Sequence, residues 1–226
     1  MDPDLQALQE VRDSVRRAVE AQKAFSSFDQ EAVDRICAAV AEAGERAAGD
    51  LARLAVEETG FGCVESKTQK NQFATREVWR SIRELKTVGF VRHDEAARVH
   101  EIAVPMGVVA GIIPVTNPTS TALFKILISL KGRNGIVLSP HPRAKRCIAA
   151  AVEVAHQAAV AAGAPPGILL CLASPTLAET SALMTHPDVA VILATGGSGL
   201  VKAAYSSGKP AFGVGPGNAP AYIHSS

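Results

Sequence analysis

Four short segments carry the groups of this sequence that are best suited to chemistry. The first spans residues 114–120, where Pro114 and Pro118 restrict the backbone around Asn117. A side-chain amide held in this way could donate a hydrogen bond to an oxyanion that develops during a reaction. Helix capping is the alternative interpretation, because Asn, Thr and Ser also bind free N–H groups at the start of a helix.

The second segment spans residues 139–142, and its two prolines stiffen the chain around a histidine. His141 could contact the ribose or a phosphate of a nucleotide. The alternative is a rigid turn that carries an exposed histidine.

The third segment spans residues 195–199 and contains three glycines ahead of an expected helix near residue 200. Glycines let a ligand approach the backbone closely, and the start of a helix favours an anion, so the segment predicts a site for a dinucleotide pyrophosphate. The usual G-x-G-x-x-G pattern is absent. The acidic ribose ligand expected about 20 residues later is also missing, because no Asp or Glu follows Asp188.

The fourth segment spans residues 213–220 and has three glycines and two prolines after a short apolar run. It predicts a specific ligand-binding loop. A tight turn without a ligand is the alternative.

The four cysteines are widely spaced and form no C-x-x-C pair, which argues against a disulfide framework. Cys63 lies in a glycine-rich turn and is expected to be the most accessible. The others are expected to be small core residues, namely Cys37, Cys147 and Cys171. None is predicted to be a nucleophile. The six histidines have no metal-ligand spacing, so no metal site is expected.

The elements that must position these segments follow from hydrophobic periodicity. Helices are expected at 4–23, 30–58 and 66–86, then two short strands at 88–91 and 98–104 separated by a polar turn at 93–95. After Pro105 apolar runs alternate with helices. The runs are 108–113, 135–138, 168–172 and 189–193, and the helices are 119–130, 143–162 and 177–184. This order predicts an α/β fold with a Rossmann-like parallel sheet, covered by helices on both faces and preceded by N-terminal helices.

Ligands of open parallel sheets bind at the carboxyl ends of the strands, where the four segments are expected to lie. The expected division is a helical segment at 1–86 packed on the cofactor domain, most simply on its sheet, a hairpin at 87–104 and an incomplete NAD(P)-binding domain at 105–226.

The overall composition is that of an ordinary soluble globular protein, with 47% hydrophobic and 20% charged residues. The net charge of +1 and the 4% aromatic content give no reason to expect a nucleic acid or a membrane as partner. The acidic start of the chain is not followed by an apolar core of the kind found in signal peptides. These features lead us to expect a cytoplasmic protein.

The four segments occur in the same order in CoA-acylating aldehyde dehydrogenases, which this sequence resembles over essentially its whole length. The resemblance is strongest to the aldehyde dehydrogenase half of bifunctional aldehyde–alcohol dehydrogenases. It extends to Lys70 and Asn71 and to residues 162–165 and 202–205.

The resemblance implies NAD(P)-dependent oxidation of a short-chain aldehyde to acyl-CoA, as in acetaldehyde dehydrogenases of the acetylating type. A cysteine thiolate attacks the aldehyde, hydride passes to NAD(P)+, and the thiol of coenzyme A releases the acyl group. Asn117 would stabilise the oxyanion. The dinucleotide, expected to be NAD on family grounds, would contact Pro114, Val115, Thr116, Ser139, Pro140, His141, Pro142, Thr195, Gly196, Gly197, Ser198, Gly215, Pro216 and Gly217.

The acyl acceptor can be predicted from the same comparison. Hydrolytic aldehyde dehydrogenases carry a water-activating glutamate in the loop that corresponds to residues 213–220. Alignment on Pro220 places Val214 at that position. Because water competes poorly without a general base, we expect coenzyme A to be the acceptor.

In the family, the nucleophilic cysteine follows the segment that matches residues 213–220 and lies in a separate catalytic domain. This sequence ends at Ser226, so we expect a fragment with an incomplete nucleotide domain that is inactive alone. The main alternative is a non-catalytic nucleotide-binding or assembly module. A third interpretation is a reductase of acyl phosphates with the same fold, and residues 116–120 argue against it.

Residues 88–104 resemble the oligomerisation hairpin of the family, so the full-length protein is expected to be a homo-oligomer. A surface hairpin packed on its own domain is an equally simple interpretation.

Overall fold

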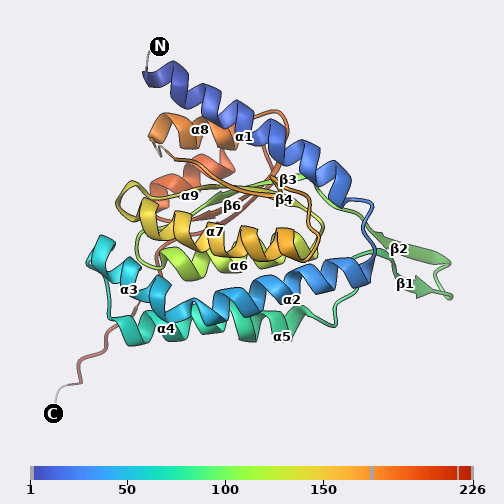
Figure 1. The fold of residues 1–226 in the computed structure, drawn as a ribbon, viewed down its shortest axis with the longest axis horizontal. Coiled ribbons are helices and arrows are strands. Elements are labelled where there is room, and N and C mark those ends of the chain that lie inside the picture. Colours follow the sequence, from blue (N-terminus) through green and yellow to red (C-terminus); the bar gives the residue numbers. More distant parts are fainter. Residues whose placement is uncertain (1–2, 174–175, 218, 225–226) are drawn as a thin grey trace.

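A five-stranded parallel sheet lies at the centre of the computed structural model, which describes residues 3–173, 176–217 and 219–224 (Figure 1). Its strand order is β5-β4-β3-β6-β7, and every neighbouring pair is parallel. The strands are β3 (Val108–Ile112), β4 (Gly135–Ser139), β5 (Leu169–Cys171), β6 (Val189–Thr195) and β7 (Ala211–Val214). All residues of β3 and β4 are buried, as expected for central strands that are covered on both faces. The predicted α/β fold is confirmed.

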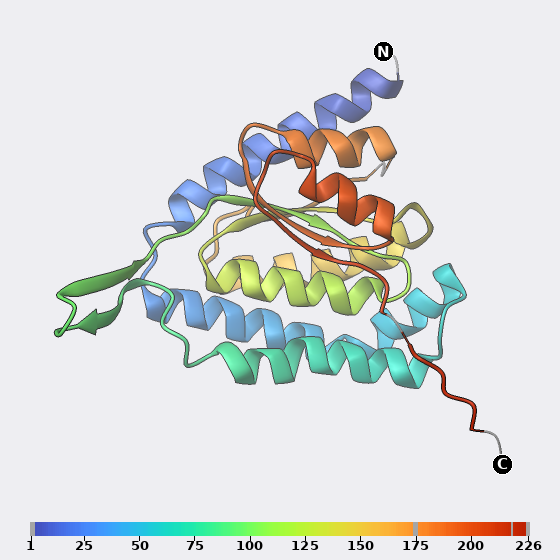
Figure 2. The ribbon, with the colours of Figure 1, turned by 180° about the vertical axis from the view of Figure 1, so that it is seen from behind.

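Helices cover both faces of the sheet, and each face has its own apolar core (Figures 1 and 2). Val109 and Leu138 point to one face, where they meet α6 (Pro118–Lys131) and α7 (Lys145–Ala161). Val108 and Val137 point to the other face, since successive strand residues alternate. That second core also contains residues of α1 (Pro3–Phe25), α8 (Leu177–Thr185) and α9 (Ser198–Tyr205).

The N-terminal helices do not all pack on the sheet as predicted. Among the described residues α1 lies against it, while α2 (Gln30–Arg46) packs on α6 and α7 as part of a further layer. The helix predicted at 30–58 is two helices, because the chain breaks at Ala47 before α3 (Ala48–Thr59).

The helix predicted at 66–86 is likewise interrupted. It consists of α4 (Val64–Gln72), the π-helical turn η1 (Phe73–Glu77) and α5 (Val78–Ile82). Gly44 of α2 packs closely on η1, because a Cβ there would lie 2.6 Å from Cγ2 of Thr75. Close packing between these two segments is a tertiary feature that a local helical pattern does not show.

The predicted hairpin consists of β1 (Gly89–Asp94) and β2 (Val99–Ala103), and it projects from the body of the molecule (Figures 1 and 2). The turn expected at 93–95 lies further along the chain. Arg98 has a positive φ of 52° and its N–H bonds to the carbonyl oxygen of Glu95. Phe90 and Ile102 are 65% and 55% exposed, so the hairpin does not fold back on its own domain. Self-association through it stays a prediction.

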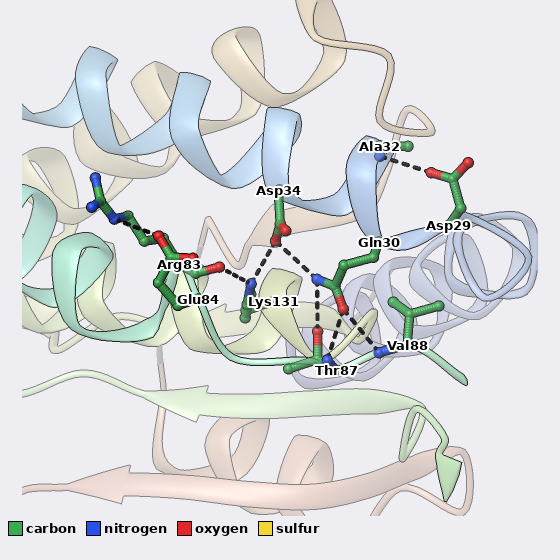
Figure 3. A network of polar contacts seen from close by, with 9 residues as sticks. All are labelled: Asp29, Gln30, Ala32, Asp34, Arg83, Glu84, Thr87, Val88 and Lys131. Atoms are coloured by element: carbon green, nitrogen blue, oxygen red, sulfur yellow. Dashed lines mark hydrogen bonds and ion pairs between the residues drawn. The ribbon is translucent and has the colours of Figure 1, made fainter. Parts of the chain in front are cut away.

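A polar network joins α2, α6 and the segment that leads to the hairpin (Figure 3). The Nζ atom of Lys131 lies 2.5 Å from Oδ1 of Asp34 and donates to the carbonyl oxygen of Arg83 at 2.8 Å. Gln30 accepts hydrogen bonds from the backbone N–H groups of Thr87 and Val88. These contacts fix the place where the chain leaves the helical layer and enters the hairpin.

Candidate nucleotide and aldehyde site

The four chemically suited segments begin at one edge of the sheet, at the ends of β3, β4, β6 and β7, and position 218 of the fourth segment lies outside the described residues. Backbone hydrogen bonds join the chain in pairs at this edge. The N–H of Ile113 bonds to the oxygen of Ser139, and the N–H of Gly196 bonds to the oxygen of Val214, both at 3.1 Å. The sequence predicted the strands that precede the first three segments. It showed only a short apolar run before the fourth, and the structure has there the strand β7, which pairs with β6.

The turn between β6 and α9 exposes backbone at the start of a helix. Gly197 is the N-cap residue of α9, and no side chain caps the helix. A Cβ at Gly197 or Gly199 would meet nothing within 4 Å, so the space in front of the turn is open. Free N–H groups and the positive end of the helix dipole can bind a phosphate there. At Gly213, by contrast, a Cβ would lie 2.6 Å from Cγ1 of Val201, which is a packing reason for glycine.

The segment after β4 presents less polar surface than the sequence suggests. Ser139 is buried, and its hydroxyl lies 2.8 Å from that of Thr180. Half-buried His141 accepts the N–H of Arg143 on Nδ1, which leaves the proton on Nε2. Burial and the nearby Arg143 lower the pKa of His141, so its ring is neutral at pH 7. A nucleotide contact by this loop stays a prediction.

Asn117 occupies the N-cap position of α6, but its side chain does not cap the helix. Its Oδ1 atom instead accepts a hydrogen bond from Nζ of Lys70 at 2.9 Å. Nζ of Lys67 donates to the carbonyl oxygen of Thr116 at 2.8 Å. The capping interpretation is therefore wrong, and the side-chain amide remains available for another role.

An open pocket of about 640 Å³ is lined in part by Lys70, the residue whose ammonium group contacts Asn117. Residues of α4 and η1 form one wall, and the first turns of α6 form the other. Its lining includes Lys70, Phe73, Thr121, Phe124 and Thr195. Thr195 ends β6, so the pocket and the open turn at α9 are neighbours.

Lys125 is a residue of this region that sequence reasoning missed. It is buried on α6, and its Nζ atom donates to the carbonyl oxygens of Ile112 and Leu193, both at 2.7 Å. It thereby joins the carboxyl ends of β3 and β6 beneath the site. Burial lowers the pKa of Lys125 to about 7, whereas the two carbonyl oxygens favour the charged form.

Three of the cysteines are poor nucleophiles. Burial raises the pKa of Cys37, Cys147 and Cys171 to about 12, so their thiols are protonated at neutral pH. Cys63 is exposed, as predicted, and its Sγ atom lies 3.2 Å from the hydroxyl of Ser66.

Neither a metal site nor a membrane span is found in residues 3–173, 176–217 and 219–224. No three or more His, Cys, Asp and Glu side chains gather there in a way that could bind a metal ion. No helix in these ranges combines the length and the apolar character that crossing a membrane requires.

Comparison with known proteins agrees with this arrangement. The model of the aldehyde dehydrogenase family matches residues 4–224. The chain belongs to the aldehyde dehydrogenase family. It is 50% identical over 209 residues to the bifunctional aldehyde-alcohol dehydrogenase AdhE of Escherichia coli strain K12, a match that covers 92% of this chain and 24% of that protein.

Two solved aldehyde dehydrogenase structures are similar to this chain. An acetylating aldehyde dehydrogenase from Geobacillus thermoglucosidasius is 57% identical with a TM-score of 0.96, over 99% of this chain and 50% of that one. A propionaldehyde dehydrogenase from Rhodopseudomonas palustris, with CoA bound and a cysteine acylated, is 30% identical with a TM-score of 0.76. That match covers 90% of this chain and 46% of the other. The chain thus spans about a quarter to a half of these relatives.

Proposed function

We propose that this chain forms the cofactor-binding part of an NAD(P)-dependent, CoA-acylating aldehyde dehydrogenase that oxidises a short-chain aldehyde to acyl-CoA. The observation that carries the proposal is the position of Asn117. Its amide caps no helix, accepts a hydrogen bond from Lys70 in the lining of the pocket, and follows β3 at the same edge of the sheet as the open turn before α9. An oxyanion donor and a phosphate-binding turn at one edge of the sheet would serve the same reaction.

Each residue has a distinct role in this proposal. When a thiolate adds to an aldehyde held in the pocket, negative charge develops on the carbonyl oxygen, and the amide of Asn117 donates a hydrogen bond to it. The backbone N–H groups at Gly197 and Ser198 bind the pyrophosphate of the dinucleotide. The bound nucleotide supplies the hydride acceptor. Phe73 and Phe124 give the pocket apolar walls that suit an alkyl aldehyde.

Nucleotide binding can be tested by calorimetric titration of the isolated chain with NAD+, NADP+ and CoA. We expect saturable binding of one nicotinamide nucleotide. Ser198→Asp should weaken it by at least roughly tenfold, because it places a carboxylate where the pyrophosphate is stabilised. The matched control is Ser206→Asp, which makes the same change at the other end of α9. No binding by the unmodified chain, or equal binding by both variants, would contradict the placement of the site.

The acyl acceptor is proposed to be coenzyme A, because Val214 offers no base that could activate water. We expect the full-length enzyme to form acyl-CoA and to release free acid at no more than roughly a hundredth of that rate. Val214→Glu should increase acid formation. Val214→Gln should not, because glutamine has the size of glutamate but cannot act as a base. Both products can be followed by chromatography. Comparable rates of hydrolysis and thiolysis in the unmodified enzyme would contradict the proposal.

We propose further that the isolated chain has no dehydrogenase activity of its own. Three of its thiols are held protonated by burial, as described above. Its mixture with aldehyde, NAD+ and CoA serves as the blank in the product assay, and steady NADH formation in that blank would contradict this part of the proposal.

A further inference from the structure

One turn of α4 holds the start of α6 through three side chains. Lys67 donates to the carbonyl oxygen of Thr116 at 2.8 Å, and Lys70 donates to Oδ1 of Asn117 at 2.9 Å. Asn71 accepts the hydroxyl of Thr119 at 2.8 Å and donates to the carbonyl oxygen of Ala48 at 2.9 Å. The positions 67, 70 and 71 lie on one face of the helix, because residues three and four apart are neighbours there.

These three contacts differ in what they hold. Lys67 and Asn71 are buried and bind the backbone at Thr116 and the side chain of Thr119, which brackets Asn117 on both sides. They therefore fix the path of the chain. Lys70 is exposed, lines the pocket and touches only the amide of Asn117 among the hydrogen bonds of the described residues. Removal of the Lys70 ammonium would leave the backbone held but the amide free.

An ammonium group sets the direction of an amide without ambiguity. Lysine carries three donors and no acceptor, so only the oxygen of the Asn117 side chain can face it. The two N–H groups on Nδ2 must then point away from Lys70. Without this contact the amide can rotate and turn its oxygen toward the substrate, where it would repel a developing oxyanion.

We infer that Lys70 is the positioning residue that orients the Asn117 amide, with Oδ1 on the lysine and Nδ2 toward the reacting carbonyl oxygen. This inference rests on the proposed function, because it assigns a direction to the donor that the function requires. It also gives a role to Lys70 that is separate from the structural role of Lys67 on the same helix.

The test is a double-mutant cycle in the full-length enzyme, with steady-state kinetics as the readout. Lys70→Met should lower kcat roughly tenfold, because about one hydrogen bond that orients the amide is lost. The KM for the nucleotide should stay unchanged. Lys70→Arg keeps a donor-only cation and should restore most of the rate. Lys23→Met, which removes an exposed lysine in the last turn of α1, is the matched control and should behave as the unmodified enzyme.

The decisive comparison is Lys70→Met made in the Asn117→Ala background. If Lys70 acts through the amide, the second change should alter kcat less than about twofold there. The same tenfold loss in both backgrounds would overturn the inference, because Lys70 would then act on the substrate directly. An unchanged kcat in Lys70→Met would also overturn it. If Asn117→Ala alone keeps full activity, the proposed function itself fails, which is a separate and recognisable result.

Discussion

Replacing Asn117 with alanine in the full-length enzyme is expected to lower kcat by about 10²- to 10³-fold, the loss that follows when one oxyanion donor is removed. The structure makes Asn117 an unusual N-cap residue, since its side chain leaves the helix uncapped and bonds to Lys70 instead. The loss should therefore appear in turnover and not in stability. Asn117→Asp is the sharper variant, because it keeps the size and the contact with Lys70 but has no N–H to donate. We expect it to be as slow as the alanine variant.

Asp29→Ala provides the control for this experiment. Asp29 is a true N-cap, whose carboxylate accepts the N–H of Ala32 at 2.8 Å at the start of α2. Its loss should cost about 1 kcal/mol of stability and leave kcat unchanged. Stopped-flow or steady-state NADH formation gives the rates, and thermal unfolding gives the stabilities. An Asn117→Ala enzyme that loses stability but keeps its rate would reverse the assignment and make Asn117 a structural cap.

The fold could be predicted because its central strands are buried on both faces. β3, β4 and β6 are largely apolar runs. When such runs are joined by helices, a parallel sheet with helices on either side buries the apolar side chains of both faces. β7 escaped prediction because it is four residues long and only partly buried. The breaks at Ala47 and in η1 lie inside stretches whose residues all tolerate a helix, so local propensity does not reveal them.

The candidate site divides in the same way. That four segments share one edge follows from parallel topology alone, because the carboxyl ends of parallel strands lie together. The contact of Lys70 with Asn117 joins residues 47 positions apart, and no periodicity connects them. Ser139 shows the opposite case, because its position after a strand suggested a ligand contact while its hydroxyl already has a partner in Thr180. Sequence patterns predict which backbone segments lie at a site. They do not predict the hydrogen-bond partner of each polar side chain, because that partner depends on tertiary packing.

Loss of the Asp34 carboxylate should have the largest effect on stability among single changes to the polar network between α2 and α6. Lys131 is 4% exposed and Asp34 is 32% exposed, and their charged atoms are 2.5 Å apart. Asp34→Ala would leave a buried ammonium with only the carbonyl oxygen of Arg83 and the ring of Trp79, whose centroid lies 5.5 Å away. Breaking a fully buried pair costs about 3–5 kcal/mol, and the partial exposure of Asp34 reduces the expected loss to about 2–3 kcal/mol.

Two further variants separate charge burial from simple loss of a contact. Glu42→Ala breaks an exposed pair with Arg46 on the same helix, whose side chains are 70% and 72% exposed, and should cost no more than about 0.5 kcal/mol. Asp34→Ala combined with Lys131→Met removes both charges and should recover part of the loss, because no unpaired charge remains buried. The free energy of unfolding in urea at pH 7 measures all three. If Asp34→Ala costs as little as Glu42→Ala, water must reach Lys131, and the network in Figure 3 would contribute little to holding the hairpin in place.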